Sequence, residues 1–469
     1  MSSACTAAWL TLGLLASGPA RADVETLRDA ISTAYRTNPV LLGQREQQKA
    51  LDETSVQARA GWRPTASVTG QANYEREPNS VTDFSEGFGS ANFGAAALTV
   101  TQPLYTGGRT TWAVRAADAG VAAGREDLRA VEEQVLLSVI QAYVDVLRDQ
   151  QILDIHQADL TTLERQAAES RAKFDLGQVT RTDVAEAESQ LEAARGALAA
   201  ATGQLQISRA AFETVVGEPP HELAEPADLP GLPATQDEAI AAAQTANPEL
   251  QQTREHERSS RAAVAEAKAG WRPTVTVQGS YGYIGPLAPL SPYDYGAAPM
   301  AAVTVSVPVL TAGVVASQVR QASAQHSSDE IAIETVRRQV VEAAVRGWSQ
   351  LQSNRLGVQA AQAQETAAAL ALKGAQAEYG FGLRTTLDVL IADENLRAAQ
   401  QTLAASRHDA FAAQAALLSA EGRLEARDLV ADEPLYDPRA NFDRVRGRGA
   451  TPWEGAIETL DKIGAPGPP

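Results

Sequence analysis

The chain of 469 residues is long enough for two or three ordinary domains or for one elongated molecule. Its formal net charge of -18 and its dispersed Lys and Arg residues argue against a nucleic-acid-binding protein, which needs basic residues clustered on one face. Aromatic residues make up only 5% of the chain and Ala fills long stretches, which favours close-packed helices over a thick globular core.

The first residues have the pattern of an export signal. An apolar run, AAWLTLGLLA, is followed by the small-x-small site ARA at 20–22, so we expect a signal peptide at 1–22. No Lys or Arg precedes the run, which leaves the true translation start open. Cys5, the only cysteine, lies in this segment, so we expect a mature chain without disulfides or a Cys nucleophile. No later stretch approaches ~18 consecutive apolar residues, which argues against a transmembrane helix.

The chain contains two copies of one unit. GWRPTASVTG, which begins at Gly61, is repeated as GWRPTVTVQG from Gly270, a difference of 209 residues (270−61). Further along the chain Gly177 matches Gly382, a difference of 205 (382−177). An Asn-Pro pair also precedes both copies. A period of this size is far longer than the ~20–50 residues of solenoid repeats, and it indicates a tandem duplication.

The duplication predicts the domain organisation. We expect a first repeat at 23–216, a Pro-rich connector at 217–235 and a second repeat at 236–421. The connector is expected to wrap around the waist of the molecule. The tail, 422–469, is rich in Pro, Gly and Arg, so we expect its first part to pack at the waist and its end to be disordered.

Each repeat contains a pair of predicted strands. Apolar and polar residues alternate strictly after Pro64 and again after Pro273, which is typical of a strand with one apolar and one polar face. The expected strands span 64–76, 91–104, 273–284 and 299–310. Membrane β-barrels use strands of about ten residues with two such faces.

A long helix follows each strand pair. No proline occurs from about Thr110 to Lys173 or from about Val315 to Tyr379. A helix of this length spans on the order of 95 Å, at 1.5 Å per residue. It is too long for a compact domain and needs neighbours to bury its apolar stripe. A long helix that continues from a membrane strand suggests a tube across an aqueous compartment.

Four strands cannot close a barrel on their own. Each unpaired backbone group in hydrocarbon costs several kcal/mol, and closure needs at least ~8 strands. Two copies of the chain would give eight strands and three would give twelve. Because an eight-stranded barrel is filled by its own side chains, a tube that passes substrates favours a homotrimer.

The GWRPT motif marks the place where a water-side helix passes to a membrane strand. Pro64 and Pro273 end the helix and are acceptable at the first position of a strand. Trp62 and Trp271 have the amphipathic ring that is favoured at the membrane–water boundary. The alternative is a packed Trp in a helix-ending turn.

The motifs together resemble the TolC-type outer membrane factor family (outer membrane efflux protein or type I secretion outer membrane channel) over nearly the whole mature chain. They are the duplicated Asn-Pro, GWRPT, TQPLYTGGR, FDLGQVTRTDVAEAES and EYGFGLRTTLDVLIADENL. The resemblance implies a mainly α, TolC-like fold with a membrane β part. The homotrimer forms a 12-stranded β-barrel, four strands per chain, in the outer membrane of a Gram-negative bacterium, continued into a periplasmic α-helical barrel.

The resemblance also implies the function and the partners. It implies an exit duct that contacts outer membrane lipid and serves an inner-membrane ABC or RND-type transporter through a periplasmic adaptor (membrane fusion protein). Opening is implied to occur by movement of the inner helical hairpin at the periplasmic tip. No cofactor is expected. The resemblance leans toward type I protein secretion, and the cargo stays open between secreted proteins and small toxic compounds.

The turns between the helices carry candidate gate residues. Asp183 and Asp388 each stand three residues after a Thr, as in a capping box, so helix capping is one explanation for both acids. By resemblance, Asp183 and Thr182 match the first-half partners of the polar contacts that close the tunnel. Arg384 and Tyr379 match the second-half partners, and Asp388 matches the first acid of a constriction ring.

Ile391 occupies the position of the ring's second acid, which leaves cation block of the constriction open. The resemblance also places the adaptor contacts at the hairpin tips, on Leu176, Gly177, Gln178, Phe381, Gly382 and Leu383.

Nothing in the sequence predicts an enzyme. The histidines are scattered without metal-ligand spacing, and no nucleophile triad or phosphate loop occurs. We therefore expect no catalytic residue and no metal site. The alternatives are a trimeric outer-membrane adhesin or structural protein, which groups its four strands at the C-terminus, and a periplasmic adaptor, which lacks such strand pairs.

Overall fold

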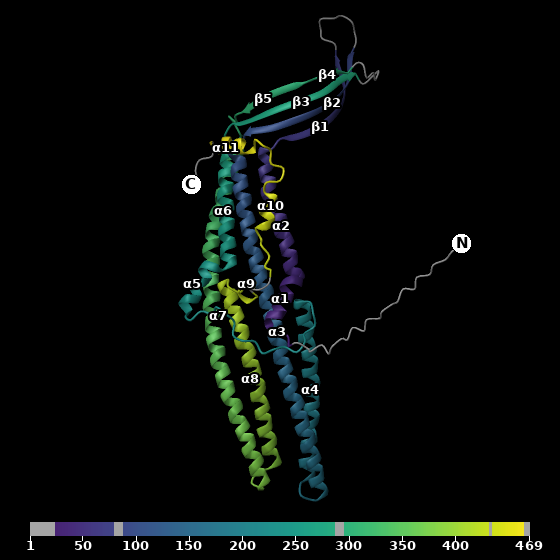
Figure 1. Ribbon diagram of the computed structural model, residues 1–469, viewed down its shortest axis with the longest axis vertical. Coiled ribbons are helices and arrows are strands. Elements are labelled where there is room, and N and C mark those ends of the chain that lie inside the picture. The colour runs from purple at the N-terminus through teal and green to yellow at the C-terminus, as the bar shows by residue number, and fades with distance from the viewer. Residues whose placement is uncertain (1–23, 79–87, 287–294, 431–433, 464–469) are drawn as a thin grey trace, which may run out of the picture. The chain divides into compact units, whose positions relative to one another are not determined.

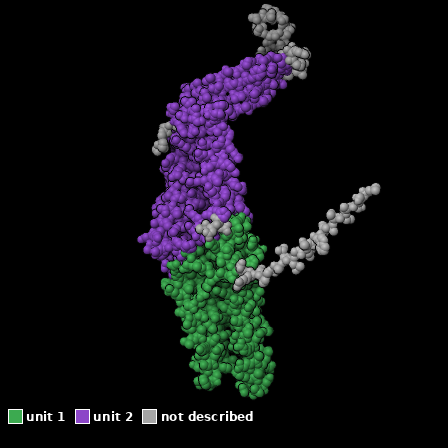
Figure 2. Space-filling view, in the orientation of Figure 1, with its two compact units in different colours: residues 1–38, 138–229, 353–412 green, residues 39–137, 230–352, 413–469 purple. Residues whose placement is uncertain are grey.

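The computed structural model describes residues 24–78, 88–286, 295–430 and 434–463. The predicted signal peptide at 1–22 lies outside the described residues, as does the end of the tail, 464–469. The chain divides into two compact units, each assembled from three separate segments (Figure 2).

The first unit, residues 1–38, 138–229 and 353–412, consists of helical hairpins. Its helices are α1 (Leu27–Thr37), the later part of α3 (Arg109–Asp175), α4 (Arg181–Val216), the later part of α7 (Val314–Gly380) and most of α8 (Thr386–Glu421). Helix α3 turns back into α4, and α7 turns back into α8 (Figure 1). A cluster of Ala and Leu side chains packs between the two hairpins: Leu163, Ala167, Ala187, Leu191, Ala194 and Leu390. Small side chains in such a cluster allow a short interhelical distance.

The second unit, residues 39–137, 230–352 and 413–469, contains the sheet, the helices that lead into and out of it, and the tail. Besides the earlier parts of α3 and α7, its elements are α2 (Pro39–Arg59), η1 (Ala60–Trp62), β1 (Thr65–Pro78), β2 (Phe88–Tyr105), α5 (Gln236–Ala246), α6 (Pro248–Ala269), β3 (Thr274–Pro286), β4 (Gly296–Ala297), β5 (Met300–Ser306), α9 (Ala426–Leu429), α10 (Ala440–Val445) and α11 (Glu454–Ile463). None of the described helices combines the length and the apolar character that a transmembrane helix requires.

The strands form one antiparallel sheet in the order β1-β2-β3, with β4 and β5 both paired to β3 (Figure 1). Val68 of β1 lies opposite Leu98 of β2, which lies opposite Tyr281 of β3. Because side chains alternate along a strand, these residues share one apolar face of the sheet. The last strand is shorter than the predicted 299–310: it ends at Ser306, because Pro308 has no N–H to donate to the ladder.

The structure explains why the Asn-Pro pair occurs twice. The side-chain amide of Asn38 donates to the carbonyl of Val215 (2.8 Å), and that of Asn247 donates to the carbonyl of Ala420 (3.1 Å). Both acceptors are carbonyls at the C-terminal end of the last long helix of the same repeat, where intrahelical partners are missing. Each Asn therefore ties the helix that precedes a strand pair to the end of its repeat, and the Pro after it starts the next helix.

The tail differs from the sequence prediction. The expectation of a disordered end is wrong for residues 454–463, which form α11 with Ile457 and Asp461 buried on one side. Local composition misled the prediction, because the order comes from contacts with residues several hundred positions earlier.

Candidate functional site

Asp461 of α11 is a fully buried carboxylate at the start of α3. Its Oδ1 accepts hydrogen bonds from the Thr106 N–H (2.8 Å), the Thr106 hydroxyl (2.8 Å) and the Gly108 N–H (3.0 Å). Its Oδ2 accepts from the Thr111 N–H (3.2 Å), the Thr111 hydroxyl (2.8 Å) and the indole N–H of Trp62 (3.2 Å). Burial acts to raise the pKa of Asp461, but these hydrogen bonds hold it below its ordinary value. The negatively charged carboxylate thus lies at the N-terminus of α3, where it interacts favourably with the positive end of the helix dipole.

Arg63 of the GWRPT motif makes a second contact with the tail. Its guanidinium binds the Glu454 carboxylate in a bidentate pair (2.9 and 3.3 Å) and donates to the carbonyl of Arg448 (2.7 Å). Planar two-point pairing of this kind fixes orientation as well as charge. The tail therefore binds the first helix-to-strand junction at two residues, Trp62 through Asp461 and Arg63 through Glu454.

The two junction Trp residues are used differently, although the sequence around them is the same. Trp62 is 1% exposed and Trp271 is 47% exposed. Trp62 is therefore the packed Trp of the alternative interpretation, held by Asp461, while Trp271 remains a predicted boundary residue. Pro64 and Pro273 each stand directly before the first residue of a strand.

The two hairpin tips have the same geometry. Gly177 and Gly382 lie in the left-handed region (φ 71° and 73°), and the N–H of the residue after each bonds back to Lys173 and Glu378 (both 2.9 Å). This is a Schellman helix end, in which glycine avoids the Cβ clash. The tips expose most of the surface of three large apolar side chains, Leu176, Phe381 and Leu383. Gln178 is exposed as well.

The capping boxes at the tips are confirmed. Asp183 accepts from the N–H and hydroxyl of Thr180 (both 2.8 Å), and Asp388 accepts from those of Thr385 (2.9 and 2.8 Å). Hydrogen bonds from the backbone and then the hydroxyl of the capping Thr lower the pKa of each Asp. Both acids are therefore charged at neutral pH. Thr182 is exposed on the first turn of α4.

The structure pairs Tyr379 with a residue that sequence reasoning missed. The Lys173 ammonium donates to the Tyr379 hydroxyl (2.9 Å) and lies 4.7 Å from the centre of its ring, which joins α3 to α7. Hydrogen bonds to Glu169 and then to Tyr379 raise the pKa of Lys173. Arg384 pairs with Glu378 (2.7 Å) and reaches Asp388 at 4.0 Å. Among the described residues, neither Tyr379 nor Arg384 has Asp183 as a hydrogen-bond or ion-pair partner.

A seam of polar pairs also joins α3 to α8. Arg397 pairs with the buried Asp159, and His408 lies 2.9 Å from Asp145. Burial acts to lower the pKa of His408, but its bonds to Asp145 and Asp409 raise it overall. No sequence signal marks these pairs, because a charged residue on a long helix is usually solvated.

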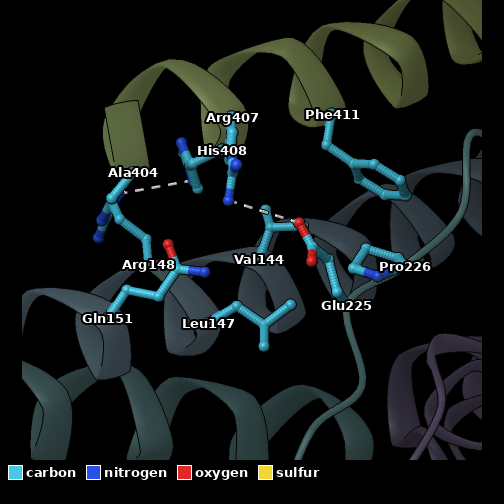
Figure 3. A pocket seen from close by; sticks show the side chains of 10 residues that line it. All are labelled: Val144, Leu147, Arg148, Gln151, Glu225, Pro226, Ala404, Arg407, His408 and Phe411. Atoms are coloured by element: carbon cyan, nitrogen blue, oxygen red, sulfur yellow. Dashed lines mark hydrogen bonds and ion pairs between the residues drawn. The ribbon is translucent and has the colours of Figure 1, made fainter. Parts of the chain in front are cut away.

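A small cavity of about 80 Å³ lies beside the seam, with an apolar floor that includes Val144, Leu147 and Phe411. Figure 3 shows Arg407 directed toward Glu225 (3.8 Å), and both residues line the cavity. The cavity is too small for a drug-sized molecule, which needs ~300 Å³ or more. We assign the cavity to packing between α3, α8 and the connector.

Comparison with known proteins identifies the family. The family model described as "Outer membrane efflux protein" matches residues 30–218 and 239–423, which are the two repeats. The chain belongs to the outer membrane efflux protein family. It is 32% identical to the outer membrane efflux protein BepC of Brucella suis over 442 residues, which cover 94% of this chain and 95% of BepC. It is 25% identical to the outer membrane protein TolC of Escherichia coli, over 96% of this chain and 92% of TolC.

The solved structures show the same fold for this chain. The Campylobacter jejuni CmeC outer membrane channel superposes with a TM-score of 0.76 at 14% identity, over 91% of this chain and 90% of CmeC. The chain is thus a TolC-like channel of the outer membrane of a Gram-negative bacterium, with a periplasmic extension, and serves as the exit duct of an export system.

One side-chain cluster in the described part of the chain has metal-ligand character. Glu257 of α6 and Glu330 of α7 lie 3.5 and 3.6 Å from the two ring nitrogens of His326. Arg261 already binds Glu257 through two nitrogens (3.0 and 2.7 Å). The Glu257 carboxylate is therefore neutralised, which argues for a structural ion-pair network rather than a metal centre.

Proposed function

We propose that the α7–α8 hairpin of each protomer closes the periplasmic end of the channel, with Asp183, Thr182, Tyr379, Arg384 and Asp388 as the gate residues. The contact between Lys173 and Tyr379 carries the proposal, since it ties α7 of one hairpin to α3 of the other. A movement of α7 and α8 away from α3 breaks this contact. The hydrogen bond between Lys173 and Tyr379 therefore stabilises the closed state.

Asp388 gives the proposed constriction its charge. Its pKa is lowered by the Thr385 cap, so three protomers bring three carboxylates to the tip. Position 391 of each protomer holds Ile, which adds no second set of charges. We propose a single acidic ring.

Replacing Tyr379 by Phe is expected to raise the conductance of the closed channel in planar bilayers. The substitution removes the hydroxyl that accepts from Lys173 and keeps the ring. A hydrogen bond is worth about 1 kcal/mol net, which shifts a closed-to-open ratio about fivefold per protomer. Arg384→Ser, which removes the pair with Glu378, is expected to act in the same direction.

The control is Arg338→Ser, which removes an exposed ion pair of the same type (Arg338 with Glu334, 2.7 Å) from α7 but outside the tip. Its closed conductance should equal that of the wild type. If neither Tyr379→Phe nor Arg384→Ser changes the conductance of the closed channel, the assignment of the gate residues is wrong.

We propose that the exposed tips bind a periplasmic adaptor, which links the channel to an inner-membrane ABC or RND-type transporter. Apolar residues at a turn with few neighbours are typical of a protein-binding surface. Phe381→Asp is expected to abolish co-purification of the adaptor from membranes while the trimer stays intact on native gels. Retention of the adaptor by the variant would exclude the tip as the adaptor-binding surface.

The Brucella suis relative is named an efflux protein, which supports small compounds as part of the cargo.

A further inference from the structure

The two faces of the sheet differ in polarity. Val68, Leu98 and Val100 share a face with Tyr281, and all four are exposed. The opposite face carries residues such as Thr69. In a membrane barrel with a polar interior the apolar face contacts lipid. This assigns Leu98 and Val100 of β2 to the lipid-facing side of the sheet.

Gln102 lies on this apolar face, two residues after Val100, at the junction end of β2. Its amide nitrogen donates to the Trp62 carbonyl (2.8 Å), and its amide oxygen accepts from the indole N–H of Trp453 (3.1 Å). Trp453 immediately precedes α11. The start of α11 is therefore attached to the lipid-facing side of the sheet, at the level where the membrane strand meets the water-side helix.

Helix α11 has three distinct sides. Ile457 and Asp461 are buried against the junction. A second side is apolar but exposed: with Trp453 it carries Leu460 and Ile463, which are 48% and 78% exposed. At 100° per residue these three side chains lie within about 80° of one another. A third side carries the ion pair of Glu458 with Lys462 (2.7 Å).

We infer that α11 is an interfacial helix that lies in the periplasmic leaflet of the outer membrane, with Trp453, Leu460 and Ile463 inserted among the lipids. The apolar side of α11 continues the apolar face of the sheet through Gln102, and this continuity favours lipid over a second copy of the chain. An amphipathic helix lies in the interface with its apolar side in the acyl boundary and its charged side in water. Trp453 adds the aromatic ring that is favoured at that depth. The C-terminal tail thus gives each protomer a lateral lipid contact beside its strands.

Site-specific labelling tests the inference in the full-length channel. A Cys5→Ser chain that carries Leu460→Cys or Ile463→Cys is labelled with an environment-sensitive fluorophore and placed in nanodiscs that contain lipids with a quencher near the headgroup. The matched control is Lys462→Cys, one residue away on the charged side. We expect at least about twofold more quenching at 460 and 463 than at 462, because only the apolar side of such a helix enters the lipid.

The outcomes separate the possible occupants of this surface. Strong lipid quenching at 460 and 463 with a blue-shifted emission supports the inference. Equal and weak quenching at all three positions, with the labels at 460 and 463 shielded from soluble quenchers, would place this side against a neighbouring protomer and overturn the inference. Equal accessibility of all three to soluble quenchers would place α11 in water, which also overturns it. The double variant Leu460→Asn/Ile463→Asn should still form trimers, because Ile457 and Asp461, which are the buried residues of α11, are unchanged.

Discussion

Replacing Asp461 by Ala is expected to cause a large loss of stability. The substitution leaves the Thr106, Gly108, Thr111 and Trp62 donors without their buried acceptor. Each unsatisfied buried donor costs about 1–3 kcal/mol, and solvent that enters the gap recovers part of that. We expect the free energy of unfolding to fall by on the order of 3 kcal/mol, measured by thermal melts of the detergent-solubilised channel.

The Asp461 contribution also has a defined pH dependence. The folded pKa is lowered, so the stabilisation is present above the unfolded pKa of about 3.8 and is lost as the pH falls through the folded value. The difference between wild type and Asp461→Ala should therefore shrink in acid below that pKa. Lys462→Ala, which removes an exposed ion pair from the same helix, is the control and should change the midpoint little. An Asp461→Ala melt that coincides with this control would contradict the assignment.

Replacing Gly422 by Ala is expected to have the second large effect. Gly422 ends α8 with φ 73°, and an added Cβ would lie 2.5 Å from the Ala246 carbonyl oxygen and from Cα of Asn247. The left-handed backbone alone costs an Ala about 1–2 kcal/mol. The backbone contact adds a clash that neither chain segment can relieve without moving the Asn247 bond to Ala420. We expect loss of the folded channel or a melt lowered by well over ten degrees, since 1 kcal/mol corresponds to about 2–4 °C in a large domain.

Gly177→Ala separates the two causes. Gly177 has nearly the same φ, 71°, but among the described residues no atom beyond its own chain neighbours lies within 4 Å of the place that an added Cβ would take. This variant should therefore show the backbone cost alone, a melt lowered by about 2–8 °C. Equal melts for Gly422→Ala and Gly177→Ala would show that the close approach at Gly422 is relieved without cost.

Features with a local or periodic signature could be predicted from the sequence. The strand faces follow from alternation, the caps at Thr180 and Thr385 from their spacing to an acid, and the left-handed turns from Gly177 and Gly382. The duplication predicted that both halves are built alike. The structural role of the Asn-Pro pairs could not be predicted from the sequence. Their hydrogen-bond acceptors, Val215 and Ala420, accept through backbone carbonyls, which any residue offers.

The contacts between distant segments could not be predicted. Asp461 and Glu454 sit in a tail whose composition is typical of disorder, and their partners Trp62 and Arg63 are nearly four hundred residues away. Lys173 likewise meets Tyr379 from another hairpin. Such pairs have no characteristic spacing in the sequence, because the tertiary fold and not the local chain brings them together.

The bond between Trp62 and Asp461 has a consequence for biogenesis. The two residues are 399 positions apart, so the first junction stays incomplete until the segment that carries Asp461 has been exported. Contacts of such long range form late, because a large loop must close first. A chain that a nonsense codon or a periplasmic protease cuts before Asp461 therefore lacks the carboxylate that binds Trp62 at the first helix-to-strand junction.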